Sequence, residues 1–170
     1  MYFTITTLAC GYYFYHTMEY LFHRIAHKPW SGYIHTYHSH HHTVCYPPKR
    51  LLAEAPYITG DGSRYLTKGA KAFIPPTIVG ALVIYNTVPD YYNLLLIGEF
   101  LTLLCISNHL HSQYHIKGSY LERFRWFLDQ REYHLFHDQF YNYNFSLGGY
   151  DTCIDKIALT YRVIPDKKTS

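Results

Sequence analysis

The residues best suited to chemistry in this sequence are its histidines, which account for 13 of the 170 positions. A metal ion needs imidazoles that converge, and residues three or four apart lie on one face of a helix. Four groups follow that spacing, and together they hold nine histidines and one aspartate: His23 and His27; His38, His41 and His42; His111 and His115; His134, His137 and Asp138. The spacing predicts helices that present metal ligands from four distant segments.

The number of these candidate ligands indicates two metal ions rather than one. A structural or catalytic zinc takes about three or four protein ligands, so ten ligands suit a pair of ions. Imidazole binds iron, copper, nickel and zinc, so the ligand type alone does not name the metal. None of the three pairs of histidines spaced i,i+4 has Glu after its first His. The H-E-x-x-H motif is therefore absent, which disfavours a hydrolytic zinc site.

Three other histidines are predicted to have different roles. His16 lies two helical turns, about 10 Å, before the first group and suits a polar position at a membrane interface. His109 lies off the face of the pair that follows it and is predicted not to be a ligand. His35 fits either a ligand or a neighbour that orients one. Glu19, one turn before His23, is predicted to orient a ligand imidazole.

A metal-binding surface tract and a haem pocket both fit the histidine groups less well than a buried dimetal centre does. A solvated His-rich surface that binds stray metal is normally a contiguous tract without helical phase. A haem pocket needs one or two axial histidines and leaves most of the groups unexplained.

The elements that must position these groups include two apolar runs, 74–88 and 91–107, separated by Pro89-Asp90 and free of Lys and Arg. Each run is shorter than the roughly 20 residues that cross a bilayer as an upright helix. The pattern predicts a helical hairpin over residues 73–107 that enters a bilayer and returns. Basic residues before and after it predict that both ends face the cytoplasm. A buried helical pair in a soluble protein is the alternative, and a mean hydropathy of −0.18 favours it.

The rest of the chain divides into further segments. The first 22 residues are uncharged except for Glu19, and they predict one membrane helix rather than a signal peptide, because no basic n-region precedes them. Residues 29–47 are polar and His-rich, 47–71 are loop-like, and 108–140 are predicted to be helical. We expect a single all-α domain over residues 1–170: an N-terminal membrane helix, the hairpin, and a cytoplasmic His-rich helical cap that holds a dimetal site.

The composition excludes several classes of protein. A formal charge of +3 without a basic stripe does not favour nucleic-acid binding. The four cysteines are scattered and form no C-x-x-C pair, which favours neither a disulfide framework nor a zinc knuckle. The 20 tyrosines suit a membrane–water interface, where an aromatic ring keeps one polar end in water.

The four histidine groups, in this order around a hairpin, resemble the histidine boxes of the fatty acid hydroxylase and sterol desaturase superfamily. Residues 19–27 resemble the first box, and 38–42 with the proline-rich basic stretch 47–51 resemble the second. Residues 111–115 and 134–138 resemble the later boxes. The tail resembles both branches of the superfamily at residues 141–145, Asp155 and 160–162.

The resemblance implies a membrane di-iron oxygenase, with the ten residues of the four groups as metal ligands. It implies two iron ions, which zinc can replace after purification because imidazole sites bind zinc more tightly than ferrous iron. The family's enzymes use O2 and electrons from NAD(P)H, and in eukaryotes they lie in the endoplasmic reticulum. A separate reductase and b-type cytochrome are expected to supply the electrons, because these 170 residues contain no cytochrome domain.

The expected reaction is hydroxylation or desaturation of a lipid. The first box and the 47–51 stretch favour a fatty acyl chain or a sphingolipid, whereas residues 142–145 and 160–162 favour a sterol desaturase or oxidase. Asp138 stands where the family has histidine. It is either a competent ligand or the mark of a non-catalytic pseudoenzyme on the same scaffold. A soluble His-rich metal buffer is a third possible class.

Overall fold

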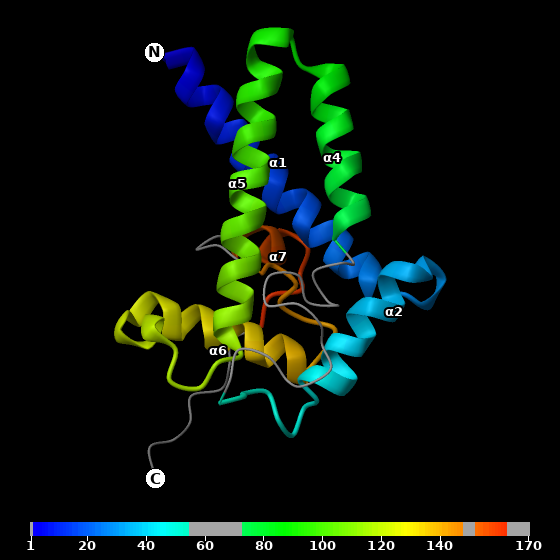
Figure 1. Cartoon of the computed structure of the whole chain (residues 1–170), viewed down its shortest axis with the longest axis vertical. Helices are drawn as coiled ribbons and strands as arrows, with labels where there is room; N and C mark the ends of the chain where they lie inside the picture. The colour runs from blue at the N-terminus through cyan, green and yellow to red at the C-terminus, as the bar shows by residue number, and fades with distance from the viewer. Residues whose placement is uncertain (1, 55–72, 148–151, 163–170) are drawn as a thin grey trace.

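The computed structural model describes residues 2–54, 73–147 and 152–162, which form helices joined by short loops (Figure 1). Within these ranges there is no β-strand, and one isolated bridge pairs Ala53 with Ile116. The predicted all-helical class is confirmed. Of the segment predicted to be loop-like, residues 47–54 are non-helical apart from a short turn, and residues 55–71 lie outside the described residues.

The predicted hairpin is present as helices α4 (Ile74–Thr87) and α5 (Asp90–Tyr114). Helix α4 has proline in its first turn, where a missing N–H costs no helical hydrogen bond. Pro89 lies in the turn between the two helices, and its carbonyl accepts the first hydrogen bonds of α5. The predicted end at residue 107 is wrong. Helix α5 continues to Tyr114, because neither proline nor glycine occurs between residues 99 and 117 to stop it.

The N-terminal helix α1 (Tyr2–Ala26) passes beside the hairpin and packs against α5 (Figure 1). Tyr15 of α1, Ile84 of α4 and Phe100 of α5 form a small buried cluster at their junction. Gly80 allows this close packing, because a Cβ there would lie 2.7 Å from Cζ of Phe100. The cluster fixes the angle between α1 and the hairpin.

The outward faces of α4 and α5 expose large apolar side chains. Helix α5 is the one described helix long and apolar enough to cross a membrane, over Tyr91–Tyr114. The predicted N-terminal helix is present as α1, but the prediction that it is a membrane helix is not supported, because α1 is not among the described helices apolar enough to cross. Helix α4 is similarly apolar but shorter. The side chains more than half exposed on these two helices are those of Ile78, Leu82, Tyr85, Tyr91 and Leu94.

The His-rich elements lie at the end of the hairpin opposite the turn that joins α4 and α5 (Figure 1). After the 3-10 turn η1 (Pro29–Ser31), helix α2 (Tyr33–His40) continues into a π-helical turn, η2 (His41–Cys45). Helix α6 (Arg125–Gln139) contacts the last turns of α5. The predicted helical stretch 108–140 is interrupted between Tyr114 and Arg125. Gly118, at a φ of 75°, lies in the turn that follows α5.

A polar network fixes α6 against the end of α5. In the 3-10 turn η3 (Tyr120–Arg123), Glu122 and Ser119 form a capping box. Arg131 of α6 donates to the Glu122 carboxylate at 2.7 Å and to the Ile116 carbonyl at 2.8 Å. These bonds connect the element that carries His134 and His137 to the loop that follows His115.

The chain after α6 is organised around one buried carboxylate, Asp155 of helix α7 (Cys153–Ile157). Its oxygens accept from the backbone N–H groups of Phe145 and Ser146, at 2.8 and 2.9 Å. They also accept from the hydroxyls of Tyr133 and Thr160, at 2.6 and 2.7 Å. Asp155 thus fixes the 143–147 segment beneath α1 and α6.

Candidate metal centre

The ten predicted ligands come together where α1, α2–η2, α6 and the end of α5 meet. The nine histidines form two groups within which the ligand atoms lie no more than 4.8 Å apart, and Asp138 forms a third such group with His41 and His42. We call the space enclosed by the ligand nitrogens of the first group position A; this group consists of His23, His27, His38, His42 and His137. Position B is the space enclosed by those of the second group, which consists of His41, His111, His115 and His134. Asp138 lies between the two groups.

The spacing at position A matches that of ligands on one ion. The Nε2 atom of His38 lies 2.9 Å from that of His27 and 3.0 Å from that of His42. The Nε2 atoms of His27 and His137 are 3.1 Å apart. Two nitrogens about 2.1 Å from one metal and at right angles are about 3.0 Å apart, so these residues fit a metal ion.

Position B has the same spacing and adds a carboxylate. The Nε2 atoms of His115 and His134 are 3.1 Å apart. Oδ2 of Asp138 lies 3.3 and 3.2 Å from these two nitrogens. Its other oxygen, Oδ1, lies 3.1 Å from Nδ1 of His42, whose Nε2 is directed to position A. One carboxylate therefore contacts ligands of both positions.

Helical phase explains how each group divides between the two positions. Each pair of histidines spaced i,i+4 serves one position: 23 with 27 and 38 with 42 at A, and 111 with 115 at B. Asp138, at i+4 from His134, places Oδ2 beside His134 at B. The histidine at i+3, His41 or His137, serves the opposite position from His38 or His134. Residue i+4 is rotated about 40° from residue i, and i+3 about 60° the other way. The H-x-x-H-H and H-x-x-H-D motifs therefore straddle both positions.

Backbone carbonyls orient several of the imidazoles. Nδ1 of His23 is 2.5 Å from the Phe145 carbonyl, and Nδ1 of His137 is 2.6 Å from that of Tyr143. Nδ1 of His115 is 2.8 Å from the Leu51 carbonyl. When Nδ1–H donates to a carbonyl, the lone pair remains on Nε2, which is the tautomer a metal at these positions needs. Sequence patterns carry no signal for these backbone partners, and we did not predict them.

The buried polar atoms also fit a cation. Among the described residues, Nε2 of His23, His41 and His111 and both oxygens of Asp138 have no hydrogen-bond partner. Leaving one such atom unpaired costs about 1–3 kcal/mol. Metal ions at A and B would satisfy these atoms and would compensate the charge of the buried Asp138 carboxylate.

The protonation states suit metal binding. Burial and the neighbouring imidazoles hold the pKa of His38 and His41 well below the usual range. Burial lowers the pKa of His115 to about 4 and that of His137 to about 3. Burial alone would raise the pKa of Asp138, but the imidazoles around it outweigh burial and hold that pKa well below its usual range. Near neutral pH the imidazoles of these four histidines are therefore neutral, and the Asp138 carboxylate is anionic.

The remaining histidines lie outside both groups. Nε2 of His109 is 2.9 Å from the Tyr120 hydroxyl, and Nδ1 of His35 is 2.9 Å from the Ala26 carbonyl. The predicted role of Glu19 in orienting a ligand is wrong. Its carboxylate instead contacts His16 at 3.2 Å and accepts from Tyr15 and Ser107, because its side chain leaves α1 towards the hairpin.

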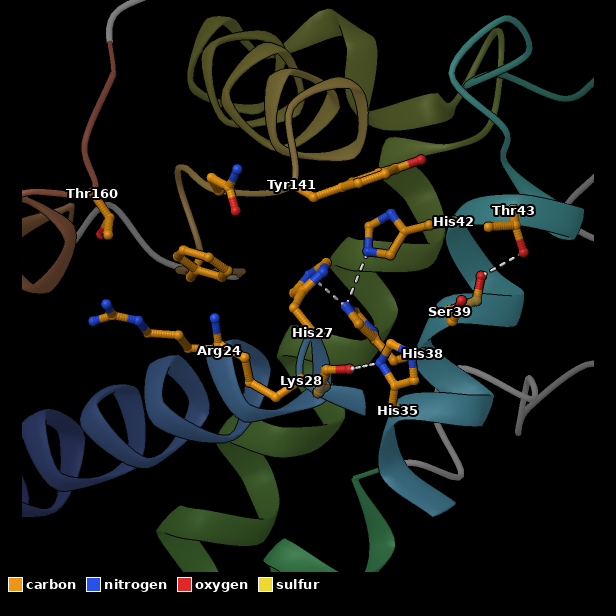
Figure 2. Close-up of a pocket in the computed structure, with 13 residues that line it drawn as sticks. Arg24, His27, Lys28, His35, His38, Ser39, His42, Thr43, Tyr141 and Thr160 are labelled. Atoms are coloured by element: carbon orange, nitrogen blue, oxygen red, sulfur yellow. Dashed lines mark hydrogen bonds between the residues drawn. The ribbon is translucent and has the colours of Figure 1, made fainter. Parts of the chain in front are cut away.

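Two cavities approach the metal positions from different sides. A polar pocket of about 480 Å³ reaches His27, His38 and His42 and is bordered by Arg24 and Lys28 (Figure 2). A second cavity of about 300 Å³, the apolar groove, lies between α1, α4 and α5. Its walls include Phe22, Phe73, Ile78, Phe100 and Leu104, and His111 lies among its lining residues.

No protein-family model, curated protein or solved structure matches this chain. The resemblance of its histidine boxes therefore depends on the residues themselves. The described residues establish an all-helical fold with a buried histidine cluster and one aspartate that can hold metal.

Proposed function

We propose that this chain is a membrane-bound di-iron oxygenase of the fatty acid hydroxylase and sterol desaturase type, acting on a lipid. One observation carries the proposal. Ten candidate ligand side chains, eight buried and two half-buried, converge on two adjacent positions, and one of those positions contains a residue, His111, that lines an apolar groove. Two ions with histidine ligands beside an apolar groove suit oxidation of a hydrocarbon chain better than hydrolysis.

The metal supplies chemistry that the side chains around it lack. Bound iron supplies the redox chemistry by which O2 oxidises an unactivated C–H bond, which acid–base side chains do not oxidise. The protein's contribution is to hold the candidate ligands in place and to pack aromatic rings against them. The buried ring of Phe145 and the half-buried ring of Phe73 pack edge-on against His23, with centroids 5.6 and 6.4 Å from that of the imidazole.

The membrane location is supported by exposure. The 18-residue apolar window of α5 is only 11% buried, whereas the core helix of a soluble protein is mostly buried. Contiguous exposed apolar surface of this kind needs a partner or a bilayer to cover it. A bilayer around the hairpin would open the groove directly to lipid tails and place the His-rich cap at the membrane surface. An endoplasmic reticulum location with the cap towards the cytoplasm is part of the proposal.

The groove selects an elongated apolar group. Its walls are mostly apolar, and the buried network of Glu19, Tyr15 and Ser107 borders one side near His111. We favour a fatty acyl chain or sphingolipid, with a sterol as the alternative substrate. Electrons would come from NAD(P)H through a reductase and a separate b-type cytochrome.

The test compares two histidines on one helix. His111→Ala removes a ligand of position B, whereas His109→Ala removes an exposed histidine outside both groups. Both variants and wild type are expressed in a host lacking its own lipid hydroxylases, and lipids are profiled by mass spectrometry. Wild type and His109→Ala should produce a lipid with one added oxygen or two fewer hydrogens, and should bind two irons per chain. His111→Ala should lose the product and retain less iron.

Two outcomes would replace the proposal. Wild type with two irons and no lipid product would favour the pseudoenzyme that Asp138 suggests. Wild type that leaves the membrane without detergent would favour a soluble metal buffer.

A further inference from the structure

The two metal positions open to different surroundings. Three ligands of position A, His27, His38 and His42, line the polar pocket (Figure 2). One ligand of position B, His111, lines the apolar groove. Among the described residues, no ligand of A lines the groove, and no ligand of B lines the pocket. The two cavities share no lining residue, so they reach the centre from separate directions.

The chemistry of the two walls differs as well. The polar pocket carries the cations of Arg24 and Lys28 and the hydroxyls of Ser39 and Thr43. In Figure 2 the Tyr141 ring lies beside His42, at a centroid distance of 5.0 Å, and borders the pocket next to position A. The groove is lined mostly by apolar side chains, and Glu19, Ser107 and Asn108 are among its polar lining residues. A positively charged, hydrated wall attracts small anions and water, and an apolar wall attracts hydrocarbon.

We propose that the two positions are not equivalent: A is the water-side metal, which exchanges small anionic or aqueous ligands through the polar pocket, and B is the lipid-side metal, which faces the substrate chain. This assignment rests on the proposed function for the identity of the lipid. The separation of the two entrances depends only on the described residues. Asp138, which contacts ligands of both positions, lies between the two.

The test uses ligand binding rather than turnover. The full chain is loaded with cobalt(II) in lipid nanodiscs, without O2, and azide is titrated while cobalt absorption is followed. Thr43→Trp narrows the polar pocket, and Asn142→Trp narrows it from the opposite wall; both residues are exposed. Cys105→Trp narrows the groove from α5 and serves as the matched control. Azide affinity should fall about tenfold in either pocket variant and stay unchanged in Cys105→Trp.

The reciprocal probe is stearic acid with a nitroxide near its methyl end. Cobalt at B should broaden the nitroxide spectrum in wild type and in both pocket variants, and Cys105→Trp should abolish the broadening. Equal azide affinity in all four proteins would overturn the assignment, as would loss of azide binding in the groove variant alone. Fewer than two cobalt ions in wild type would overturn both the metal centre and this assignment. A chain that passes these tests but oxidises no lipid would contradict the proposed function only.

Discussion

At the scale of single residues, the ligand set differs from an all-histidine centre at one position. Asp138 places Oδ2 beside two imidazoles of B and Oδ1 beside His42. A carboxylate is a harder ligand than imidazole and carries a full charge, so it lowers the net charge of the site by one. A buried anion of this kind requires a compensating cation.

Asp138→Asn tests whether this carboxylate holds a metal. The amide keeps the shape, removes the charge and binds metal weakly, so we expect the ion at B to be lost and the ion at A to remain. Metal analysis of the purified protein should show about half the wild-type metal, because one of the two expected ions is lost.

Asp138→His supplies the comparison, because imidazole can replace the carboxylate as a ligand and should keep two ions per chain. Unchanged metal in Asp138→Asn would contradict a ligand role. If wild type binds fewer than two ions per chain and Asp138→His binds two, the aspartate is instead a substitution that has weakened the metal site.

At the scale of elements, each metal position depends on segments that carry no ligands. The carbonyls of Phe145 and Tyr143 orient His23 and His137, and Asp155 holds that segment by two backbone hydrogen bonds. Asn144, at a φ of 55°, reinforces it by pairing with the backbone of Arg162. Position A therefore depends on the tail of the chain more strongly than position B does.

Asp155→Asn tests this dependence. The amide would turn an N–H donor towards the donors that the carboxylate now accepts from, leaving buried groups unpaired at a cost of about 1–3 kcal/mol. We expect a lower melting temperature in detergent and a weaker metal affinity at A than at B.

Asp129→Asn is the matched control for Asp155→Asn. Asp129 is half exposed and pairs with the exposed Arg125, so its loss should change stability by less than about 1 kcal/mol. Equal loss of metal from both positions in Asp155→Asn would show that the tail supports the whole cap rather than position A.

Sequence spacing predicted that the ligands belong to helices, but not how they divide. The i,i+4 pairs could be recognised in the sequence because they share a face of one helix. Their assignment to A or B depends on the packing of α1, α5 and α6, and on the π turn at His41–Cys45, none of which periodicity encodes. The Leu51 carbonyl beside His115 comes from a loop 64 residues away, a contact that no local pattern reveals.

At the scale of the whole molecule, the hairpin and the His-rich cap lie at opposite ends of the long axis (Figure 1). The hairpin helices expose large apolar side chains, whereas the cap buries a cluster of polar groups. The hairpin and its apolar faces were predictable from two apolar runs. The groove was not, because it forms only when α1 packs beside both hairpin helices.

The exposed hairpin predicts that the chain resists extraction from membranes by alkaline carbonate and is released by detergent. Leu82→Glu combined with Leu94→Glu places charges on the exposed faces of α4 and α5, at about 2–3 kcal/mol each if those faces contact lipid. Membrane fractionation should show this variant depleted from the membrane or degraded.

Leu159→Glu is the control for this variant, because Leu159 is 82% exposed but lies in the tail after α7. It should fractionate like wild type. Release of the wild-type chain by carbonate would contradict a membrane-inserted hairpin.

The arrangement of ligands along the chain also sets the order of assembly. Both positions take ligands from early segments, yet each also needs α6: His137 for A, His134 and Asp138 for B. A ribosome that has not yet released α6 has completed neither ligand set. A nascent chain arrested before residue 134 would carry seven of the ten candidate ligands, four at position A and three at position B, and would lack the Asp138 carboxylate.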